Sequence, residues 1–203
     1  MIKKLVSIGV LLLSASSVAQ ADARADLQKK LATFDNYSAD FSQQVFDEQG
    51  EQMQKANGTM QLARPDRFRW HTQAPDESVI VSNGQDVWMY DPFVEQVSIA
   101  PLAQAIQNTP FILIAGGDNS RWQHYDVSRK AGDYVVTSKD PSELIGEFSI
   151  RFDNKDRIQR FTVVESGGQR SEFNLQNINT QPKVSSSTFT FTPPKGVMID
   201  DQR

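Results

Sequence analysis

The residue types that most often carry out catalysis are scarce in this chain of 203 residues, which has no cysteine and two histidines. Thiol catalysis and metal sites built from cysteine are therefore excluded, and His71 and His124 do not have the spacing of a local metal-binding pair. His71 alternates with Phe68 and Trp70, which favours a solvent-facing position on a strand. His124 is expected in a short connecting strand after Trp122.

Two further patterns resemble chemical sites but have simpler interpretations. Asp200-Asp201 resembles a carboxylate pair, yet adjacent side chains diverge, and we expect a solvated tail. The glycines of ESGGQ (165–169) are typical of a hairpin turn rather than of a phosphate-binding loop. The serine motif of α/β-hydrolases is absent from the sequence. We therefore predict no catalytic residue, no metal site and no cofactor.

One arginine interrupts an apolar strand face. Counting by two, and provided that the bend at 65–66 keeps the parity, the residues that point the same way are Met60, Leu62, Arg64, Phe68 and Trp70. A guanidinium on such a face needs partners, because a desolvated charge is costly. Its fork of N–H donors suits the free carbonyls at the C-terminus of a helix. The alternative is a surface ion pair with the neighbouring Asp66.

The first 21 residues have the pattern of a secretory signal peptide. Lys3 and Lys4 precede the apolar segment LVSIGVLLLSASSV (5–18), and Ala19-Gln20-Ala21 supplies the small residues of a cleavage site. We expect cleavage after Ala21, which leaves one exported domain, residues 22–203. No later segment has the apolar length of a transmembrane helix.

The charge of the predicted mature chain argues against two classes of partner. Removing Lys3 and Lys4 reduces the 21 basic residues to 19, against 25 acidic residues, a net charge of −6. This charge disfavours nucleic acid and anionic lipid surfaces as partners. Without cysteine the fold has no disulfides, so packing alone must stabilise it.

The elements that would position Arg64 follow from hydrophobic periodicity. ADARADLQKKLATF (21–34) has the period of a helix, and from Tyr37 onward the period is two. ESVIVSNGQDVWMYDP (77–92) predicts a hairpin with its turn at Asn83-Gly84, where both residues tolerate positive φ. Four more strands are predicted in YVVTS (134–138), ELIGEFSIRF (143–152), RIQRFTVVES (157–166) and SEFNLQNI (171–178). The result is an antiparallel meander that must curl to protect its edges.

The apolar face of this meander needs a cover, and residues 101–117 can supply one. We expect short helices in PLAQAIQ (101–107) and PFILIAG (110–116), with Thr109 as an N-cap and Gly116-Gly117 as the stop. A strand in FILIA (111–115) is the alternative. A helix here is apolar on every side, so the surface that does not pack on the sheet either meets a neighbour or lines a cavity.

Several segments resemble the LolA family of periplasmic lipoprotein carriers, in matching order over essentially the whole mature chain. They are RPDRFRW (64–70), PDESVIVSNG (75–84), VWMYDPFVEQV (87–97), NTPFILIAGG (108–117) and FTFTPPKGVMIDDQR (189–203). The resemblance implies an incomplete antiparallel β-barrel, closed by a lid of short helices over a hydrophobic cavity. Residues 116–118 depart from the family pattern, which leaves the C-terminal boundary of the lid open.

The resemblance also implies a function and its residues. A monomeric periplasmic carrier would take lipoproteins by their acyl chains from the inner-membrane transporter LolCDE and deliver them to the outer-membrane receptor LolB. Arg64 corresponds to a residue that latches the lid, Pro101–Gly117, and Phe68 to an aromatic that faces lipid and partners. The expected cavity lining is Met60, Leu62, Phe68, Trp70, Phe111, Ile112 and Leu113.

Two other functions remain open from the residues themselves. A periplasmic binding protein for free lipid or another small apolar ligand would also have a hydrophobic cavity but would need no protein partner. A hydrolase acting on lipid would need a nucleophile and a base, which the sequence does not offer.

Overall fold

The computed structural model describes residues 15–105, 111–116, 119–142 and 144–203. The side chains of residues 15–21, 111 and 112 are outside this description, as are the predicted cap Thr109 and the second glycine of the predicted helix stop, Gly117.

A single curved sheet of 12 strands dominates the molecule, in the order β12-β6-β5-β4-β3-β2-β1-β11-β10-β9-β8-β7. Its strands are β1 (Asn36–Phe46), β2 (Gln52–Ala63), β3 (Arg67–Thr72), β4 (Ser78–Asn83), β5 (Asp86–Asp91), β6 (Gln96–Pro101), β7 (Tyr125–Lys130), β8 (Asp133–Ser138), β9 (Ile145–Phe152), β10 (Ile158–Glu165), β11 (Arg170–Asn179) and β12 (Met198–Asp201). The α-helices are α1 (Ala15–Leu31), α2 (Leu102–Ala105) and α3 (Phe111–Ala115), and two 3₁₀ helices are η2 (Asn119–His124) and η3 (Ser186–Phe189).

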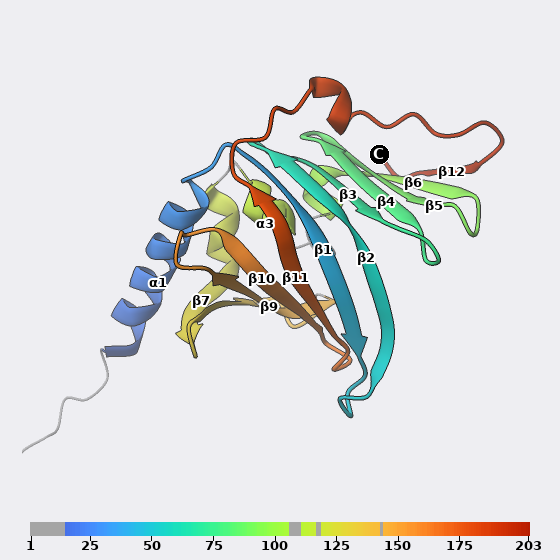
Figure 1. Ribbon diagram of the computed structural model, residues 1–203. Coiled ribbons are helices and arrows are strands. Elements are labelled where there is room, and N and C mark those ends of the chain that lie inside the picture. The colour runs from blue at the N-terminus through green and yellow to red at the C-terminus, as the bar shows by residue number, and fades with distance from the viewer. Residues whose placement is uncertain (1–14, 106–110, 117–118, 143) are drawn as a thin grey trace, which may run out of the picture.

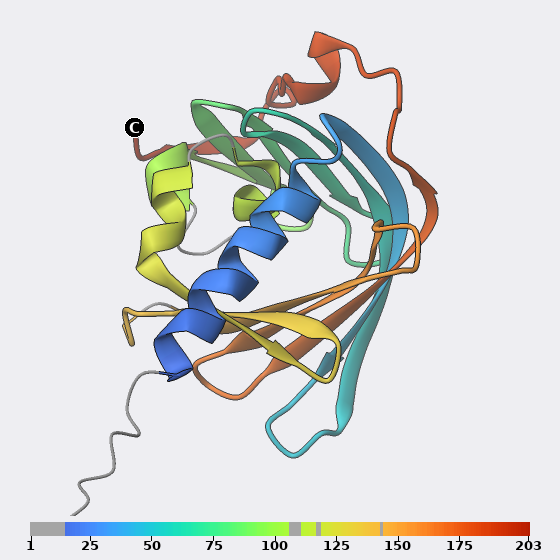
Figure 2. The same ribbon diagram turned by 90° about the vertical axis from the view of Figure 1, so that its left-hand side faces the viewer.

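The sheet curls around the helices without closing. Figures 1 and 2 show α1, α2 and α3 on its concave side and the segment that carries η3 outside β3 to β6. Strands β12 and β7 stand at the two ends of the strand order. The expected mainly-β fold with an incomplete antiparallel barrel is confirmed, with one exception: β12 pairs with β6 in parallel.

The strands form because apolar side chains recur at every second position and bury one face. In β3, Phe68, Trp70 and Thr72 are buried while the residues between them are partly exposed. Gly58 in β2 is needed for a close approach, because a Cβ there would lie 2.1 Å from the carbonyl oxygen of His71 and 2.4 Å from the ring of Phe41.

Helix α1 buries the stripe that the sequence indicated. Leu27, Leu31 and Phe34 are all buried and belong to the main apolar cluster of the concave side. The helix itself ends at Leu31, so Phe34 lies in the turn before β1.

The predicted β4–β5 hairpin is present, but its turn is centred one residue later than expected. Ser82 pairs with Val87, so Gly84 and Gln85 occupy the centre. Gly84 has a φ of +97°, whereas Asn83 acts through its side chain, whose Oδ1 accepts from the backbone N–H groups of Gln85 and Asp86. The turn is shifted because the side-chain carbonyl of an asparagine can take the place of a backbone acceptor, so Asn83 can precede the turn instead of standing at its centre.

The cover over the concave face is helical, which settles the choice for FILIA in favour of helix α3. The first helix begins one residue later than expected: Pro101 ends β6 opposite Asp86, and α2 begins at Leu102. Its expected end at Gln107 lies outside the described residues. Proline has no backbone N–H to donate to a neighbouring strand, and at the end of a strand this missing hydrogen bond is tolerated.

Two expectations about the remaining segments were wrong. The segment from Trp122 to His124 belongs to the 3₁₀ helix η2, not to a strand: Trp122 is buried while Gln123 and His124 are both exposed, so burial here does not alternate with a period of two. Asp200 and Asp201 are exposed, as expected, but they are part of β12 rather than of a free tail. Arg203 follows this strand and pairs with Asp201 at its end and with Asp86 of β5.

Candidate functional site

The residues expected to line a cavity lie together under the helices. Met60, Leu62, Phe68, Trp70 and Leu113 are each at most 5% exposed and belong to one apolar cluster. The side chains of Phe111 and Ile112 are outside the description, although their backbone forms the first turn of α3. In this arrangement the described members fill one another's space as packed core, and their role as a lipid-binding lining stays a prediction.

Strand register explains why these residues share a face. Residues directly opposite each other in neighbouring strands point to the same side of a sheet. One such row runs from Met60 through Trp70, and a second runs from Leu62 through Phe68. The bend between β2 and β3 therefore keeps the parity that the sequence argument assumed.

An aromatic group forms the floor of this region. The ring of Phe41 stacks on Trp70 with centroids 4.0 Å apart, and Phe161 stacks on Phe173 at 4.6 Å. Trp70 also meets Phe173 edge-on at 5.3 Å. Phe41, Phe161 and Phe173 were not predicted to be site residues, although their alternation with polar residues on β1, β10 and β11 was the available signal.

Arg64 lies where β2 ends and joins the sheet to two helices. Its Nη1 donates to the carbonyl oxygen of Gly116 at 2.6 Å, and its Nη2 donates to those of Ile114 at 2.9 Å and Leu31 at 2.8 Å. These carbonyls are at the C-terminal ends of α3 and α1, where no further helical N–H is available to them. The acceptors are of the kind that the sequence predicted for this guanidinium, and its role as a latch stays a prediction.

Burial makes these hydrogen bonds more important to Arg64. Desolvation lowers the pKa of its guanidinium, while the negative charges of Asp35 and Asp66 act in the opposite direction. Its carbon Cζ lies 5.8 Å from the centre of the Phe34 ring. Among the described residues, its Nε is buried without a hydrogen-bond partner. The side chain is thus held by carbonyl dipoles in a desolvated setting.

Asp66 reinforces the same junction. Its backbone N–H, at a φ of +61°, donates to the carbonyl of Ala115 at 2.9 Å, and its carboxylate accepts from Arg121 at 2.6 and 3.3 Å. The hydroxyl of Ser82 donates to its carbonyl at 2.7 Å. Asp66 is 9% exposed, so the surface ion pair considered as an alternative for Arg64 does not describe this residue. The pair with Arg121 was not foreseen, because nothing in sequence relates positions so far apart.

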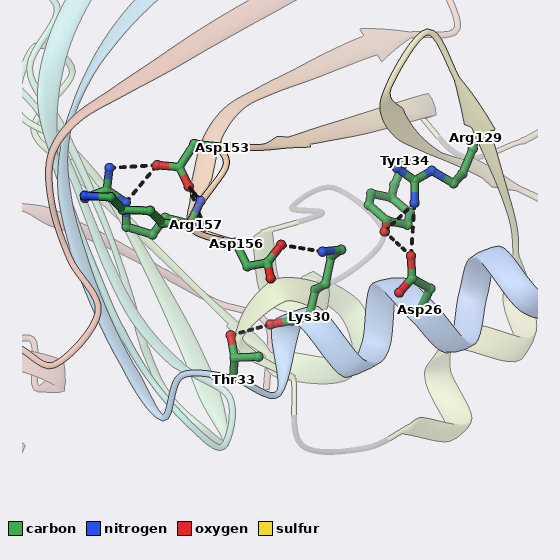
Figure 3. Close-up of polar contacts among 9 residues, drawn as sticks. Asp26, Lys30, Thr33, Arg129, Tyr134, Asp153, Asp156 and Arg157 are labelled. Carbon is green, nitrogen blue, oxygen red and sulfur yellow. Dashed lines mark hydrogen bonds and ion pairs between the residues drawn. The ribbon is translucent and has the colours of Figure 1, made fainter.

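Helix α1 is fastened differently, by its own side chains (Figure 3). Asp26 accepts hydrogen bonds from Tyr134 and, at 3.0 Å, from Arg129, and Lys30 binds Asp156. The hydrogen bond from Tyr134 is the largest influence on Asp26 and holds the pKa of its carboxyl below the usual value. Burial and this carboxylate raise the pKa of the Tyr134 phenol.

The described part of the chain offers no obvious place for a metal ion. Within it, no group of three or more histidine, aspartate or glutamate side chains is arranged to hold one. His71 lies beside Glu77, with Nε2 and the carboxylate 3.1 Å apart, and is half-exposed on the outer face as predicted. None of the helices in the described ranges has the length and hydrophobicity needed to cross a membrane.

Comparison with known proteins gives a consistent result. The family model of the outer membrane lipoprotein carrier protein LolA matches residues 32–192. The chain is 51% identical over 201 residues to the outer-membrane lipoprotein carrier protein of Aeromonas salmonicida strain A449, with 99% of this chain and 100% of that protein covered. It is 43% identical over 201 residues to the protein of that name from Serratia proteamaculans strain 568, with 99% and 98% covered.

A solved structure supports the fold alone. An uncharacterised conserved protein from Thermus thermophilus matches with a TM-score of 0.53 at 12% identity, over 90% of this chain and 99% of that one. The family follows from sequence instead: the family model spans more than half of the chain, and both relatives match nearly its full length. The chain therefore belongs to the LolA family of outer membrane lipoprotein carrier proteins.

Proposed function

We propose that this chain is a periplasmic carrier that binds the acyl chains of lipoproteins released from the inner membrane by the LolCDE transporter and delivers them to the outer-membrane receptor LolB. It is exported with removal of residues 1–21 and works without catalysis. Family membership supports the lipoprotein cargo. The observation that carries the mechanism is Arg64, whose donors join the sheet to the end of α3 above a continuous apolar cluster.

In the proposed cycle the packed cluster is the closed, empty state. When α3 leaves the carbonyl contacts of Arg64, the side chains beneath it lose their cover and become available to acyl chains. Residues Met60, Leu62, Phe68, Trp70, Phe111, Ile112 and Leu113 are the proposed lining. The same apolar helix thus packs on the sheet when the site is shut and contacts lipid when it is open.

The energies favour a carrier whose closed state competes with its cargo. Burial of hydrocarbon yields about 0.8 kcal/mol per CH₂, so one acyl chain of about fifteen methylenes represents roughly 12 kcal/mol. Unaided escape of a lipoprotein into water is therefore negligibly slow. A carrier must hold this cargo but still lose it to the acceptor, and the free energy needed to open the latch lowers its apparent affinity.

The test is release of a labelled lipoprotein from spheroplasts with and without the purified mature protein. Release into the soluble fraction as a complex with the protein, followed by transfer to membranes that contain the receptor, is the expected result. No release above the level without protein would contradict the proposal. Intact-mass analysis of protein purified from the periplasm separates the alternative, because free fatty acid or phospholipid alone would indicate a binder of small apolar ligands.

A further inference from the structure

The apolar row that begins under the helices continues beyond them. Register places Trp70 opposite Ile80, Ile80 opposite Met89, and Met89 opposite Ser98. These residues therefore lie on the concave face, and Ile80 and Met89 pack against the main cluster while remaining half-exposed. Along this row Trp70 is buried, whereas Ile80 is half-exposed.

A pocket of about 320 Å³ opens at this point. It is lined by Ser78, Val79, Ile80, Met89, Tyr90, Asp91, Val94, Gln96 and Ser98. Ile80 and Met89 give it an apolar floor that is continuous with the buried cluster, and Val94 adds an apolar wall from the β5–β6 turn. Among the described residues, this space lies beside the proposed lipid site, next to the half-exposed Ile80 and Met89.

The β5–β6 turn extends this apolar surface outward. Phe93 is 94% exposed and Val94 is 55% exposed. The carboxylate of Asp91 fixes the turn by accepting from the backbone N–H groups of Phe93 at 2.8 Å and Val94 at 3.4 Å. Together with the apolar floor of the pocket, Phe93 and Val94 give this end of the sheet more exposed apolar surface than a single side chain would, which is typical of a site for an apolar ligand.

We propose that this pocket is an entry vestibule in which one acyl chain of the cargo lodges before α3 opens. The inference rests on the proposed function and adds a binding subsite to it. An acyl chain that starts on Ile80 and Met89 can advance along the row to Trp70 and Met60 without returning to water. Asp91 is the one charged residue among the described lining residues, and its carboxylate disfavours anionic ligands such as a free fatty acid or a phosphate headgroup.

The absence of cysteine from the whole sequence makes a direct test practical. Ser98→Cys in the full mature chain places one thiol on the pocket wall, where an environment-sensitive fluorophore is attached. The probe is a synthetic lipopeptide with an N-terminal diacylglyceryl-cysteine, and the control ligand is the same peptide without acyl chains. We expect a blue shift with the lipopeptide only. Ser128→Cys on β7 is the matched control position and should not respond.

A second variant tests the vestibule without a label. Ile80→Asn combined with Met89→Gln removes the apolar floor, and Met53→Gln, at a methionine that is 64% exposed on β2, is the control. We expect the double variant to load lipopeptide about tenfold more slowly, with the same amount bound at saturation, while the control loads normally. Urea unfolding of each variant establishes that the fold is retained.

The outcomes separate the vestibule from the carrier function. Co-elution of lipopeptide with the wild type, together with a silent label at position 98 and normal loading by the double variant, would overturn the vestibule and leave the carrier function standing. An equal blue shift with the unacylated peptide would also overturn it, since the pocket would then be a peptide groove. If lipopeptide does not co-elute with the wild type at all, the proposed function itself fails.

Discussion

Helices α1 and α3 both cover the concave face of the sheet, but different contacts hold them there. Helix α1, of which residues 22–31 remain in the proposed mature chain, is fastened by its own side chains to β7, β8 and the β9–β10 turn. The contacts come from Asp26, Lys30 and Arg24, whose Nη2 donates to the carbonyl of Tyr125 at 2.6 Å. The five residues of α3 are held at their C-terminal carbonyls by Arg64 and by the backbone N–H of Asp66.

This difference indicates which helix moves. The contacts of α1 are spread over separate strands, so that losing one leaves the others in place. The polar contacts described for α3 converge on two neighbouring residues of the β2–β3 bend, so that a change at this bend affects them together. Arg64 also binds the last carbonyl of α1, but α1 has further side-chain contacts of its own on other strands. We infer that α1 is a fixed wall of the site and α3 its movable cover.

The largest effect on stability expected from this comparison comes from introducing a carboxylate at a buried position beside each helix. Leu27 of α1 and Phe68 of β3 are both buried. If α1 does not move, a carboxylate buried beneath it cannot be hydrated, so Leu27→Glu should lower the free energy of unfolding by about 3 kcal/mol or more. Phe68→Glu should lower it less, because opening of α3 admits water, but should impair lipoprotein binding more. Urea unfolding and lipopeptide co-elution measure the two effects, and equal losses of stability would contradict the distinction.

Replacing Arg64 tests the cover itself. Arg64→Leu removes the donors and keeps an apolar stem, and charge-assisted hydrogen bonds are worth about 1.5–3 kcal/mol each, so lid opening should shift by about two powers of ten or more. The variant should accept lipoprotein but release it poorly to the receptor, because closure no longer competes with the cargo. Transfer of the same labelled lipoprotein from wild type and variant to the receptor is the measurement.

The controls for Arg64 use the same type of residue and the same charge. Arg69→Leu makes the same change on β3, on the face opposite to Phe68 and Trp70, and should transfer normally. Arg64→Lys should be intermediate, since one ammonium cannot reproduce the guanidinium fork. Equal transfer by wild type and Arg64→Leu would refute the latch. Hydrogen exchange should be faster at Ala115 and Gly116 in Arg64→Leu, with Leu27 unchanged.

The contacts of these two helices were predictable from sequence to different degrees. The sheet and the stripe of α1 followed from hydrophobic periodicity, because burial of one face dictates the spacing. The helical cover was predicted from its prolines and expected caps instead, since FILIA is apolar throughout and has no period. The carbonyl acceptors of Arg64 followed because an arginine with the parity of Met60 and Leu62 has few other ways to satisfy its donors. Both arguments depend only on local pattern and on the cost of desolvation.

The side-chain fastening of α1 was not predictable in the same way. Asp26 is separated from Tyr134 by 108 positions and Asp66 from Arg121 by 55, and these pairs depend on how α1 and η2 dock on the curled sheet. Many charged residues have the same periodicity on exposed faces, so pattern does not select partners. The parallel pairing of β12 was missed for a related reason, since its four residues are all exposed and carry no periodic signal.

A smaller effect is expected from the phenol that binds α1. Tyr134→Phe removes the hydroxyl that donates to Asp26 but keeps the buried ring, so the free energy of unfolding should fall by about 1 kcal/mol. Transfer of lipoprotein to the receptor should not change, because α1 does not move. Urea unfolding and the transfer assay are made on the same preparation. A transfer defect as large as that of Arg64→Leu would place α1 in the moving part.

The smallest effect is a dependence of stability on pH that comes from the fastening of α1. The hydrogen bond from Tyr134 lowers the pKa of Asp26 in the folded protein below its ordinary value of 3.8. A carboxyl with a lowered folded pKa contributes stability that is complete above the unfolded pKa and is lost as the pH falls through the folded one. Asp26→Asn keeps an acceptor for Tyr134 but removes this titration. The difference in unfolding free energy between wild type and Asp26→Asn should therefore be present at about pH 6 and shrink toward about pH 2.5.

The lowered pKa of Asp153 affects both proteins equally and cancels in that difference. If instead the stability difference for Asp26→Asn stayed constant down to about pH 2.5, its carboxylate would not fasten α1 as an anion.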